Sequence, residues 1–290
     1  MRRTLAIRDL MRPLEAWAFL DPAGEWLSAK VGSMLAPGAL KTALSGTVLG
    51  HPLHPALTDV PIGVLTAATM FDLLGGEAGG DTADALTVLG LLSVAPTAVT
   101  GLSDWADTVD AERRLGLIHA LANAGSSALY FAALVSRRSG SRGLARVFSV
   151  AGFGVLATSG YIGGHLVFAR GWGVDHTVFD EPPQDWTKVA READLQPDTP
   201  VLAQAAGYGV LLYSRGGSVH AIAARCTHAG GPLNEGEVDD ELCVTCPWHG
   251  SRFRLDDGSV ARGPATAPQP AFDVRTADGN IEVRVRADIG

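Results

Sequence analysis

Cys226-Thr-His228, followed further on by Cys246-Pro-Trp-His249, is the stretch that decides the fold of the C-terminal part of this chain. Each of the two segments offers one thiol and one imidazole. Thiolates bind iron and its bridging sulfides, and neutral imidazoles can hold a second iron near the surface. A Cys2His2 zinc site would use the same four ligands. The glycines after each pair favour the iron–sulfur centre, because glycine lets the backbone approach a bulky inorganic core. No finger-type helix spacing follows.

The pattern Cys-x-His…Cys-x-x-His resembles that of the Rieske family, and the resemblance covers about residues 181–288. It implies a small antiparallel β-domain that binds one 2Fe–2S cluster. By the same resemblance, Cys226 and Cys246 hold the inner iron, and His228 and His249 hold the outer iron. From residue 201 the hydrophobic period changes to two, and turn signals such as Arg-Gly-Gly and Ala-Asp-Gly-Asn separate the expected strands, which agrees with such a domain.

Residues beside the second ligand pair are expected to tune the cluster. High-potential members of the family carry a Ser after the second-loop glycine, a Tyr two residues later, and a disulfide between the loops. This chain has Ser251, but Phe253 stands at the Tyr position, and Gly231 and Trp248 stand at the disulfide positions. Hydrogen bonds to the sulfurs, net charge and exposure set the potential, so we expect roughly −150 to +50 mV.

The other polar features of the C-terminal part have simpler interpretations. The acidic residues within 235–241 are expected to form a solvated hairpin tip, and docking of a basic redox partner is the alternative. Cys243 is expected to be an inward-facing strand residue and not a ligand. With three cysteines in all, no disulfide framework is possible. The net charge of −8 argues against nucleic acid as a partner.

The first half of the chain contains four apolar segments. Residues 85–103 are uncharged for 19 residues, and 115–136 and 147–168 are each uncharged for 22, His aside. The weaker segment 56–74 carries Asp59 and Asp72 near its ends. About 20 helical residues cross a hydrocarbon layer of about 30 Å, and small residues four apart, as in Gly160-x-x-x-Gly164, let spanning helices pack closely. A soluble bundle rich in Ala and Gly is the alternative, but the uncharged lengths favour a transmembrane four-helix bundle in contact with a lipid bilayer.

The chain is therefore expected to be multi-domain, an α-helical bundle followed by an all-β domain. The expected parts are an amphipathic N-terminal segment over 1–45, a four-helix transmembrane domain over 46–178, a linker over 179–200 and the Rieske domain over 201–290. The N-terminal segment alternates apolar residues with Arg2, Arg3, Arg8 and Arg12, which is typical of a segment at a membrane surface. A packed N-terminal helix is the alternative, and no cleaved signal peptide is expected.

The distribution of Lys and Arg predicts the orientation. Four crossings place both termini and the 104–114 loop on one side, and this side holds most of the positive residues. Cytoplasmic loops are enriched in Lys and Arg, so the Rieske domain is expected to face the cytoplasm, in a bacterial inner membrane. The third loop disagrees with this orientation, because it carries four arginines: Arg137, Arg138, Arg142 and Arg146.

Several histidines of the membrane half are expected to converge near one end of the bundle. The segment His51-Pro-x-His54-Pro, with Gly-Gly-His165 at the end of the last apolar segment, resembles an uncharacterised bacterial membrane-domain family over about residues 46–176, and this resemblance implies no chemistry. Ionisable groups in spanning helices usually mark a function. We therefore hypothesise that His119 and His165 ligate a haem b, or that the cluster of His51, His54, His119 and His165 forms a quinone site. Hydrogen bonds to Asp59 or Asp104 are the alternative.

Together these features predict a membrane-anchored electron carrier that serves a redox protein partner. Two alternatives stay open: a quinol or haem-linked oxidoreductase in which the helical domain holds a second cofactor, and a redox-sensing membrane protein. A self-contained catalyst is less expected than a carrier. A Rieske-type oxygenase would need a two-histidine, one-carboxylate iron site on a further domain, and the upstream histidines lack that spacing.

Overall fold

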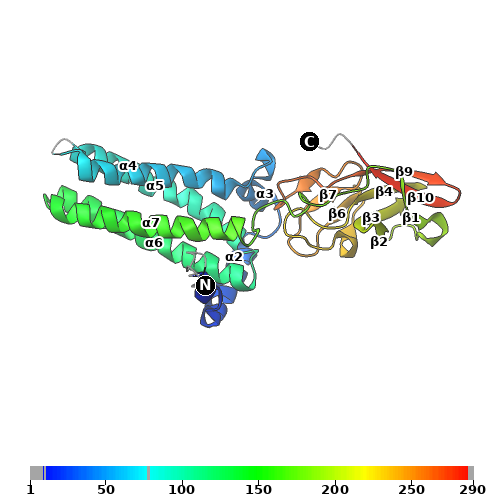
Figure 1. Cartoon of the computed structure of the whole chain (residues 1–290), viewed down its shortest axis with the longest axis horizontal. Helices are drawn as coiled ribbons and strands as arrows, with labels where there is room; N and C mark the ends of the chain where they lie inside the picture. The colour runs from blue at the N-terminus through cyan, green and yellow to red at the C-terminus, as the bar shows by residue number, and fades with distance from the viewer. Residues whose placement is uncertain (1–8, 10, 77–78, 287–290) are drawn as a thin grey trace, which may run out of the picture. The chain divides into compact units, whose positions relative to one another are not determined.

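The computed structural model describes residues 9, 11–76 and 79–286. The chain forms two compact units, each built from two stretches of sequence. One unit is helical and contains residues up to 34 together with 53–172. The other is mainly β and contains 35–52 together with the residues from 173 onward. The predicted division into a helical and a β part is thus confirmed, and Figure 1 shows the two kinds of structure.

Four long helices make up the helical unit. They are α4 (Leu53–Leu74), α5 (Gly79–Trp105), α6 (Asp110–Arg138) and α7 (Arg142–Phe168). All four are long and apolar enough to cross a membrane. Helix α4 packs along α5 and α6 packs along α7, so the bundle consists of two antiparallel hairpins (Figure 1). Prolines lie inside α4 and α5 without ending them.

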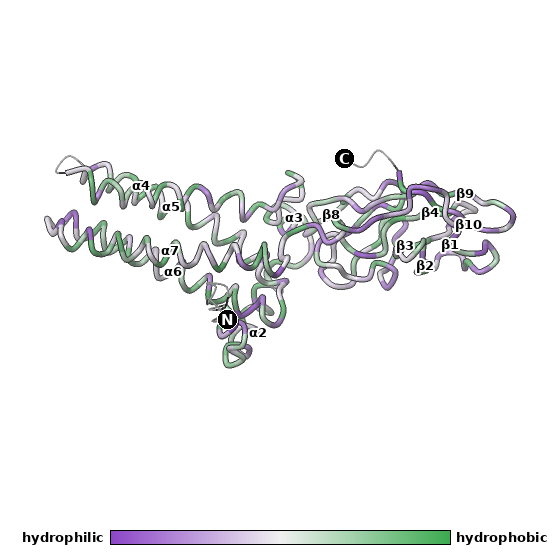
Figure 2. Tube along the Cα trace, in the orientation of Figure 1, coloured by the Kyte–Doolittle hydropathy of each residue, from purple (hydrophilic) through white to green (hydrophobic). Residues whose placement is uncertain are grey.

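The polarity of the bundle is that of a protein in lipid. Only 22–28% of the most apolar stretch of each helix is buried. Large apolar side chains such as Leu92 and Phe131 are exposed, at 68% and 59%. The buried positions hold small hydroxyl residues such as Thr87 and Ser126 beside apolar residues such as Leu65 and Tyr130. Figure 2 shows the predominance of hydrophobic residues along α4–α7. An apolar exterior of this kind is stable when the surrounding solvent is hydrocarbon.

A buried ion-pair network joins all four helices near one end of the bundle. Arg137 of α6 bonds to Asp72 of α4 at 2.5 Å and to Asp84 of α5 at 2.6 Å. Its guanidinium also donates to Thr87 at 2.6 Å, and Arg146 of α7 donates to the backbone oxygen of Asp72 at 2.8 Å. The Arg137 and Asp72 side chains are only 4% and 5% exposed. In the sequence, Asp72 and Arg137 are charged residues in or beside apolar helices. In the structure they form a buried ion pair with each other.

The short helices α1 (Met11–Glu15), η2 (Ala18–Leu20) and α2 (Asp21–Met34) pack on the other end of the bundle. Met11 is buried with Leu115 and Ile162, and Asp21 forms an ion pair with Arg114 at 2.6 Å. The described part of the N-terminal segment is therefore packed helix, with exposed aromatic side chains such as Trp26. Arg2, Arg3 and Arg8 of the predicted amphipathic segment lie outside the described residues.

The β unit contains three small antiparallel sheets. The first has the order β1 (Thr187–Arg191), β10 (Asn280–Val285), β9 (Phe272–Ala277), and the second has β2 (Val201–Ala205), β3 (Tyr208–Arg215), β4 (Ser218–Ala223). The third has β5 (Glu237–Val238), β6 (Cys243–Thr245), β7 (Arg252–Arg254), β8 (Val260–Arg262). Three single turns, η3 (Thr47–Leu49), η4 (Glu192–Asp194) and η5 (Leu233–Glu235), complete the unit together with α3 (Ala39–Ser45).

Strand β3 explains why the unit has two cores. Val210 and Leu212 point into one core with Ile281 and Val283 of β10. Leu211 and Tyr213 point into the other core, which also contains Cys226 and Cys246, the predicted cluster ligands. Because successive side chains of a strand face opposite ways, an unbroken apolar run of this kind is buried on both faces. The second core thereby attaches the cluster loops to the centre of the fold.

The observed boundaries differ from those expected. Residues 35–52 belong to the β unit, although they precede the first long helix. Strand β1 lies in the expected linker and pairs with β10. Strand β1 is short and carries Lys188 and Arg191, so its sequence has no clear hydrophobic alternation.

Candidate metal centre

Two loops carry the predicted ligands, and they are built in the same way. In the first loop, Cys226 N donates to Gly231 O and Gly230 N donates to Cys226 O, both at 2.8 Å. In the second loop, Cys246 N donates to Ser251 O at 2.8 Å and Gly250 N donates to Cys246 O at 3.0 Å. Gly230 and Gly250 have φ angles of +78° and +74°, where L side chains are strained. The glycines after each ligand pair therefore shape the loops.

The two cysteine thiols converge below these loops. Both are buried, and neither forms a disulfide. The Cys226 thiol donates a hydrogen bond to Cys246, which lowers the pKa of Cys246 to about 7 and raises the pKa of Cys226. The backbone N–H groups of residues 228 and 229 also donate to the Cys226 sulfur, and those of 248 and 249 donate to the Cys246 sulfur. Such donors stabilise thiolates, which are the form that binds iron.

The two histidine side chains lie together at the outer end of the loops. The ring centroids of His228 and His249 are 5.1 Å apart, with an angle of 84° between the rings. Burial lowers the pKa of His228 to about 3, and the neighbouring charges of His249, Lys41 and His176 add to this effect. The imidazole is therefore neutral and has a lone pair available for a metal. Both rings are partly exposed, and Trp248 beside them is 57% exposed.

The arrangement fits a 2Fe–2S cluster. Two buried thiols on one side and two partly exposed imidazoles on the other match the asymmetric ligation of the two irons. Cys226 and Cys246 would hold the inner iron, and His228 and His249 would hold the outer one. A cluster bound there accepts and gives up one electron. A β-carbon at Gly231 would lie 2.9 Å from the Cys246 sulfur, so only glycine leaves that sulfur accessible.

The three predicted tuning residues occupy different environments. The Ser251 side chain is fully buried, and its Oγ accepts a hydrogen bond from Ala265 N at 2.9 Å. Phe253 is fully buried in the core that contains the ligand cysteines, and it offers no hydroxyl group. Trp248 lies at the surface, with its ring centroid 6.4 Å from that of His249. Because Ser251 Oγ is the acceptor in this hydrogen bond, its hydroxyl hydrogen takes no part in it.

Sequence reasoning missed the contribution of residues 35–52 to this end of the β unit. Thr47 Oγ1 donates to Ala265 O at 2.9 Å, and Gly263 N donates to Thr42 Oγ1 at 3.2 Å. A β-carbon at Gly250 would lie 2.7 Å from Pro37, so this segment packs against the second cluster loop. Lys41 of the same segment is 3% exposed and acts electrostatically on His228. A single lysine in an otherwise uncharged stretch was the available signal.

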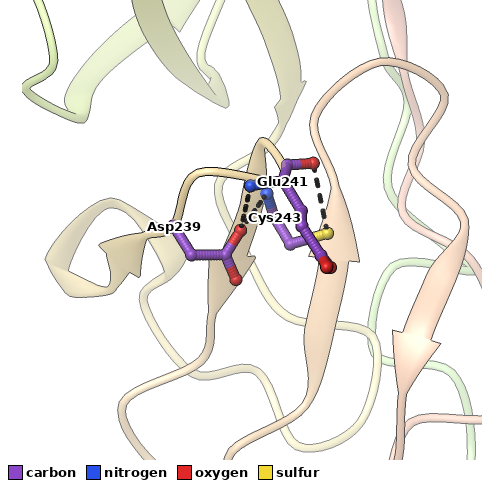
Figure 3. Close-up of side chains that lie close together, drawn as sticks. All are labelled: Asp239, Glu241 and Cys243. Atoms are coloured by element: carbon purple, nitrogen blue, oxygen red, sulfur yellow. Dashed lines mark hydrogen bonds between the residues drawn. The ribbon is translucent and has the colours of Figure 1, made fainter.

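The acidic turn between the loops is held together by hydrogen bonds and ion pairs. Asp239, Glu241 and Cys243 lie within reach of one another (Figure 3). The Asp239 carboxylate accepts hydrogen bonds from the backbone N–H groups of Glu241 at 2.9 Å and Cys243 at 3.1 Å. Arg252 forms ion pairs with both Asp239 and Glu241. Both carboxylates therefore have structural partners within the turn. Cys243 is buried in β6, as expected for a strand residue.

The histidines of the membrane half do not gather as expected. His119 faces His54, and not His165, with ring centroids 6.4 Å apart. His165 instead bonds to Glu15 of α1 at 2.8 Å, which removes it from the proposed haem pair. His51 lies in the β unit, where its Nδ1 contacts Pro52 O at 2.8 Å. His54 and His119 contact the backbone oxygens of Thr97 and Ser159, respectively.

Comparisons with known proteins agree with this geometry. Residues 185–275 match the Rieske 2Fe–2S domain, and residues 50–176 match DUF2231, a family described as a predicted membrane protein. The 3-phenylpropionate/cinnamic acid dioxygenase ferredoxin subunit of Escherichia coli strain K12 is 35% identical over 72 residues, which are 25% of this chain and 68% of that protein. Its counterpart in Photorhabdus laumondii is 31% identical over 33% of this chain and 81% of that protein.

One solved structure is also similar to part of this chain. The ferredoxin of carbazole 1,9a-dioxygenase from Nocardioides aromaticivorans IC177 is 30% identical, with a TM-score of 0.34, over 35% of this chain and 98% of that chain. The paired Cys and His loops, the three antiparallel sheets and the matching relatives lead to one conclusion. This chain belongs to the Rieske 2Fe–2S family, whose cluster-binding domain it joins to a DUF2231 membrane-type helical domain.

Proposed function

We propose that this protein is a membrane-anchored carrier of single electrons, which enter and leave through the exposed edge formed by His228 and His249. The observation that carries the proposal is the pair of partly exposed imidazoles above two buried thiols, in a chain whose four long helices have apolar surfaces. The outer iron of such a centre lies within reach of a partner, whereas the inner iron lies in the protein core.

A redox protein is proposed as the partner. The two relatives described above are ferredoxin subunits of a dioxygenase, which supports a carrier role for this domain. Trp248 is 57% exposed directly beside His249, and exposed aromatic residues of this kind often anchor protein partners. The partner is therefore expected to cover Trp248 and the two imidazoles together.

Stopped-flow reduction of cytochrome c by the full chain in nanodiscs tests this proposal. We expect one electron to leave per 2Fe–2S cluster. We expect Trp248→Ala to slow the second-order reaction roughly tenfold, about 1.4 kcal/mol, with little change of potential, and Trp248→Phe to keep most of the rate. Failure of the reduced cluster to pass its electron to cytochrome c would contradict the carrier mechanism. An unchanged rate in Trp248→Ala would exclude this edge as the docking surface.

The β unit is further proposed to face the cytoplasm. The side of the bundle that holds both chain termini and the 104–114 loop has the excess of Lys and Arg, and such sides usually face the cytoplasm. The structure weakens the main objection, because Arg137 and Arg138 of the third loop form ion pairs with Asp84 and have a structural role there. Labelling of a cysteine introduced at Lys188 of β1 in intact cells and in inverted vesicles measures the side. Labelling in intact cells by an impermeant reagent would overturn the orientation.

A further inference from the structure

Two histidines face each other inside the helical unit. His54 lies in the first turn of α4, and His119 lies in α6. Their ring centroids are 6.4 Å apart, and their planes are nearly perpendicular, at 87°. The two residues come from different hairpins of the bundle, so only the packing of α4–α5 against α6–α7 brings them together.

Each imidazole is oriented by a backbone oxygen of the neighbouring helix. His54 Nδ1 lies 3.0 Å from Thr97 O of α5, and His119 Nδ1 lies 2.9 Å from Ser159 O of α7. A carbonyl oxygen only accepts hydrogen bonds, so the hydrogen of each ring is on Nδ1. Each Nε2 then carries a lone pair. Histidines that bind metals are commonly fixed in this way, with the second nitrogen donating to a backbone carbonyl.

The two hairpins use the same device to make room for the rings. Gly101 follows Thr97 by one helical turn, and Gly163 follows Ser159 by one turn. A β-carbon at Gly101 would lie 2.7 Å from Cε1 of His54, and one at Gly163 would lie 3.1 Å from Cε1 of His119. The two hairpins therefore repeat one arrangement. In each, the first helix carries the His, and the second helix carries both the carbonyl oxygen that contacts the ring and the Gly, one turn later, that leaves room for it.

We propose that His54 and His119 are the two axial ligands of a haem held between the hairpins. Both rings present lone pairs, whereas a quinone carbonyl needs a hydrogen-bond donor. A bare metal ion would need more ligands than two imidazoles. Among the described residues, the group of three or more potential metal ligands is Asp239, Glu241 and Cys243, which lies in the β unit and not beside these histidines. A porphyrin supplies four nitrogens to its iron and leaves two axial positions for imidazoles.

The separation of the rings agrees with this ligand. Metal–imidazole bonds are about 2.0–2.1 Å long, so an iron between two Nε2 atoms holds the ring centres roughly 6 Å apart. Asn123 is the residue that must respond to binding. Its Nδ2 lies 3.1 Å from His119 Nε2, and this hydrogen bond must break before Nε2 can bind iron. Asn123 therefore competes with haem for His119.

Absorption spectra of the full chain, produced with added haem precursor and titrated with hemin in detergent, test the site. This site is independent of the proposed carrier function, since the EPR signal of the Rieske cluster reports separately on the β unit. We expect one low-spin haem per chain, with the highly anisotropic EPR signal that perpendicular axial imidazoles give. A wild-type chain that takes up no hemin, or that binds it only in the high-spin form, would overturn the proposal.

Single substitutions assign the ligands. His54→Ala and His119→Ala are each expected to abolish the low-spin spectrum, and His165→Gln is the matched control that should keep it. Asn123→Ala is expected to bind hemin at least as tightly as the wild type, which provides a test even if a His variant fails to fold. A low-spin spectrum that survives in both folded Ala variants would show that other residues hold the haem. Binding of zinc but not of hemin would also refute the proposal.

Discussion

Replacing Ser251 by Ala should lower the reduction potential of the cluster. The Ser251 side chain is fully buried and follows the second ligand pair, and its backbone oxygen accepts the hydrogen bond that closes the Cys246 loop. Its Oγ already accepts from Ala265 N at 2.9 Å. The hydroxyl hydrogen is therefore available to donate, and the cluster sulfurs are the acceptors that we expect it to reach. Reduction adds one negative charge to the cluster, so such a donor stabilises the reduced form more than the oxidised form.

The size of the shift follows from the energy of that hydrogen bond. A hydrogen bond to a charged group contributes about 1.5–3 kcal/mol. For a one-electron couple, about 59 mV corresponds to about 1.4 kcal/mol, so a bond made to the reduced cluster alone is worth roughly 60–130 mV, and this is the upper limit of the expected decrease. The variant also leaves Ala265 N without this buried acceptor, which is expected to reduce stability by about 1–3 kcal/mol.

Spectroelectrochemical titration of the full chain, monitored by visible circular dichroism, measures the potential. Ser218→Ala is a suitable control, because Ser218 is exposed in β4. Iron content and the rhombic EPR signal of the reduced cluster must be unchanged in both variants for the comparison to hold. An unchanged potential in Ser251→Ala with a full cluster would show that the hydroxyl group does not donate to the cluster.

Three further predictions concern separate parts of the molecule. Lys41→Met should lower the reduction potential of the cluster by tens of millivolts, because it removes a buried positive charge that acts on His228. Redox titration measures this shift, and the control variant Lys188→Met should leave the potential unchanged. Arg137→Met should destabilise the bundle by about 3–5 kcal/mol in thermal unfolding, since the buried Asp72 loses its partner. Arg138→Met, at a side chain 62% exposed, should cost under about 1 kcal/mol, and equal losses would contradict the network. Cys243→Ser should keep the two irons of the cluster, and loss of cluster iron would reveal a role in ligation.

Much of the site is predictable from the sequence because its ligands are adjacent in the chain. Cys226 and His228 are two residues apart, and Cys246 and His249 are three apart, so each loop brings its own pair together. The identity of the ligands and the glycines beside them indicate the cofactor before any folding is considered. Likewise, a spanning helix is recognised by its length without charge, which is a local property. The cluster-binding β domain and the four apolar helices were expected on these grounds.

Contacts between distant segments were decided by the tertiary structure alone. Each residue turns a side chain by about 100° around a helix, so sequence patterns do not fix which histidines face each other across a bundle. The structure pairs His119 with His54 and gives His165 to Glu15. The same reason explains Lys41, whose place beside the cluster depends on residues 35–52 folding back onto loops more than 200 positions later. The sequence by itself determined the chemistry of the cluster and the apolar spans, because both are local. Packing between remote segments decided which charges and imidazoles surround them.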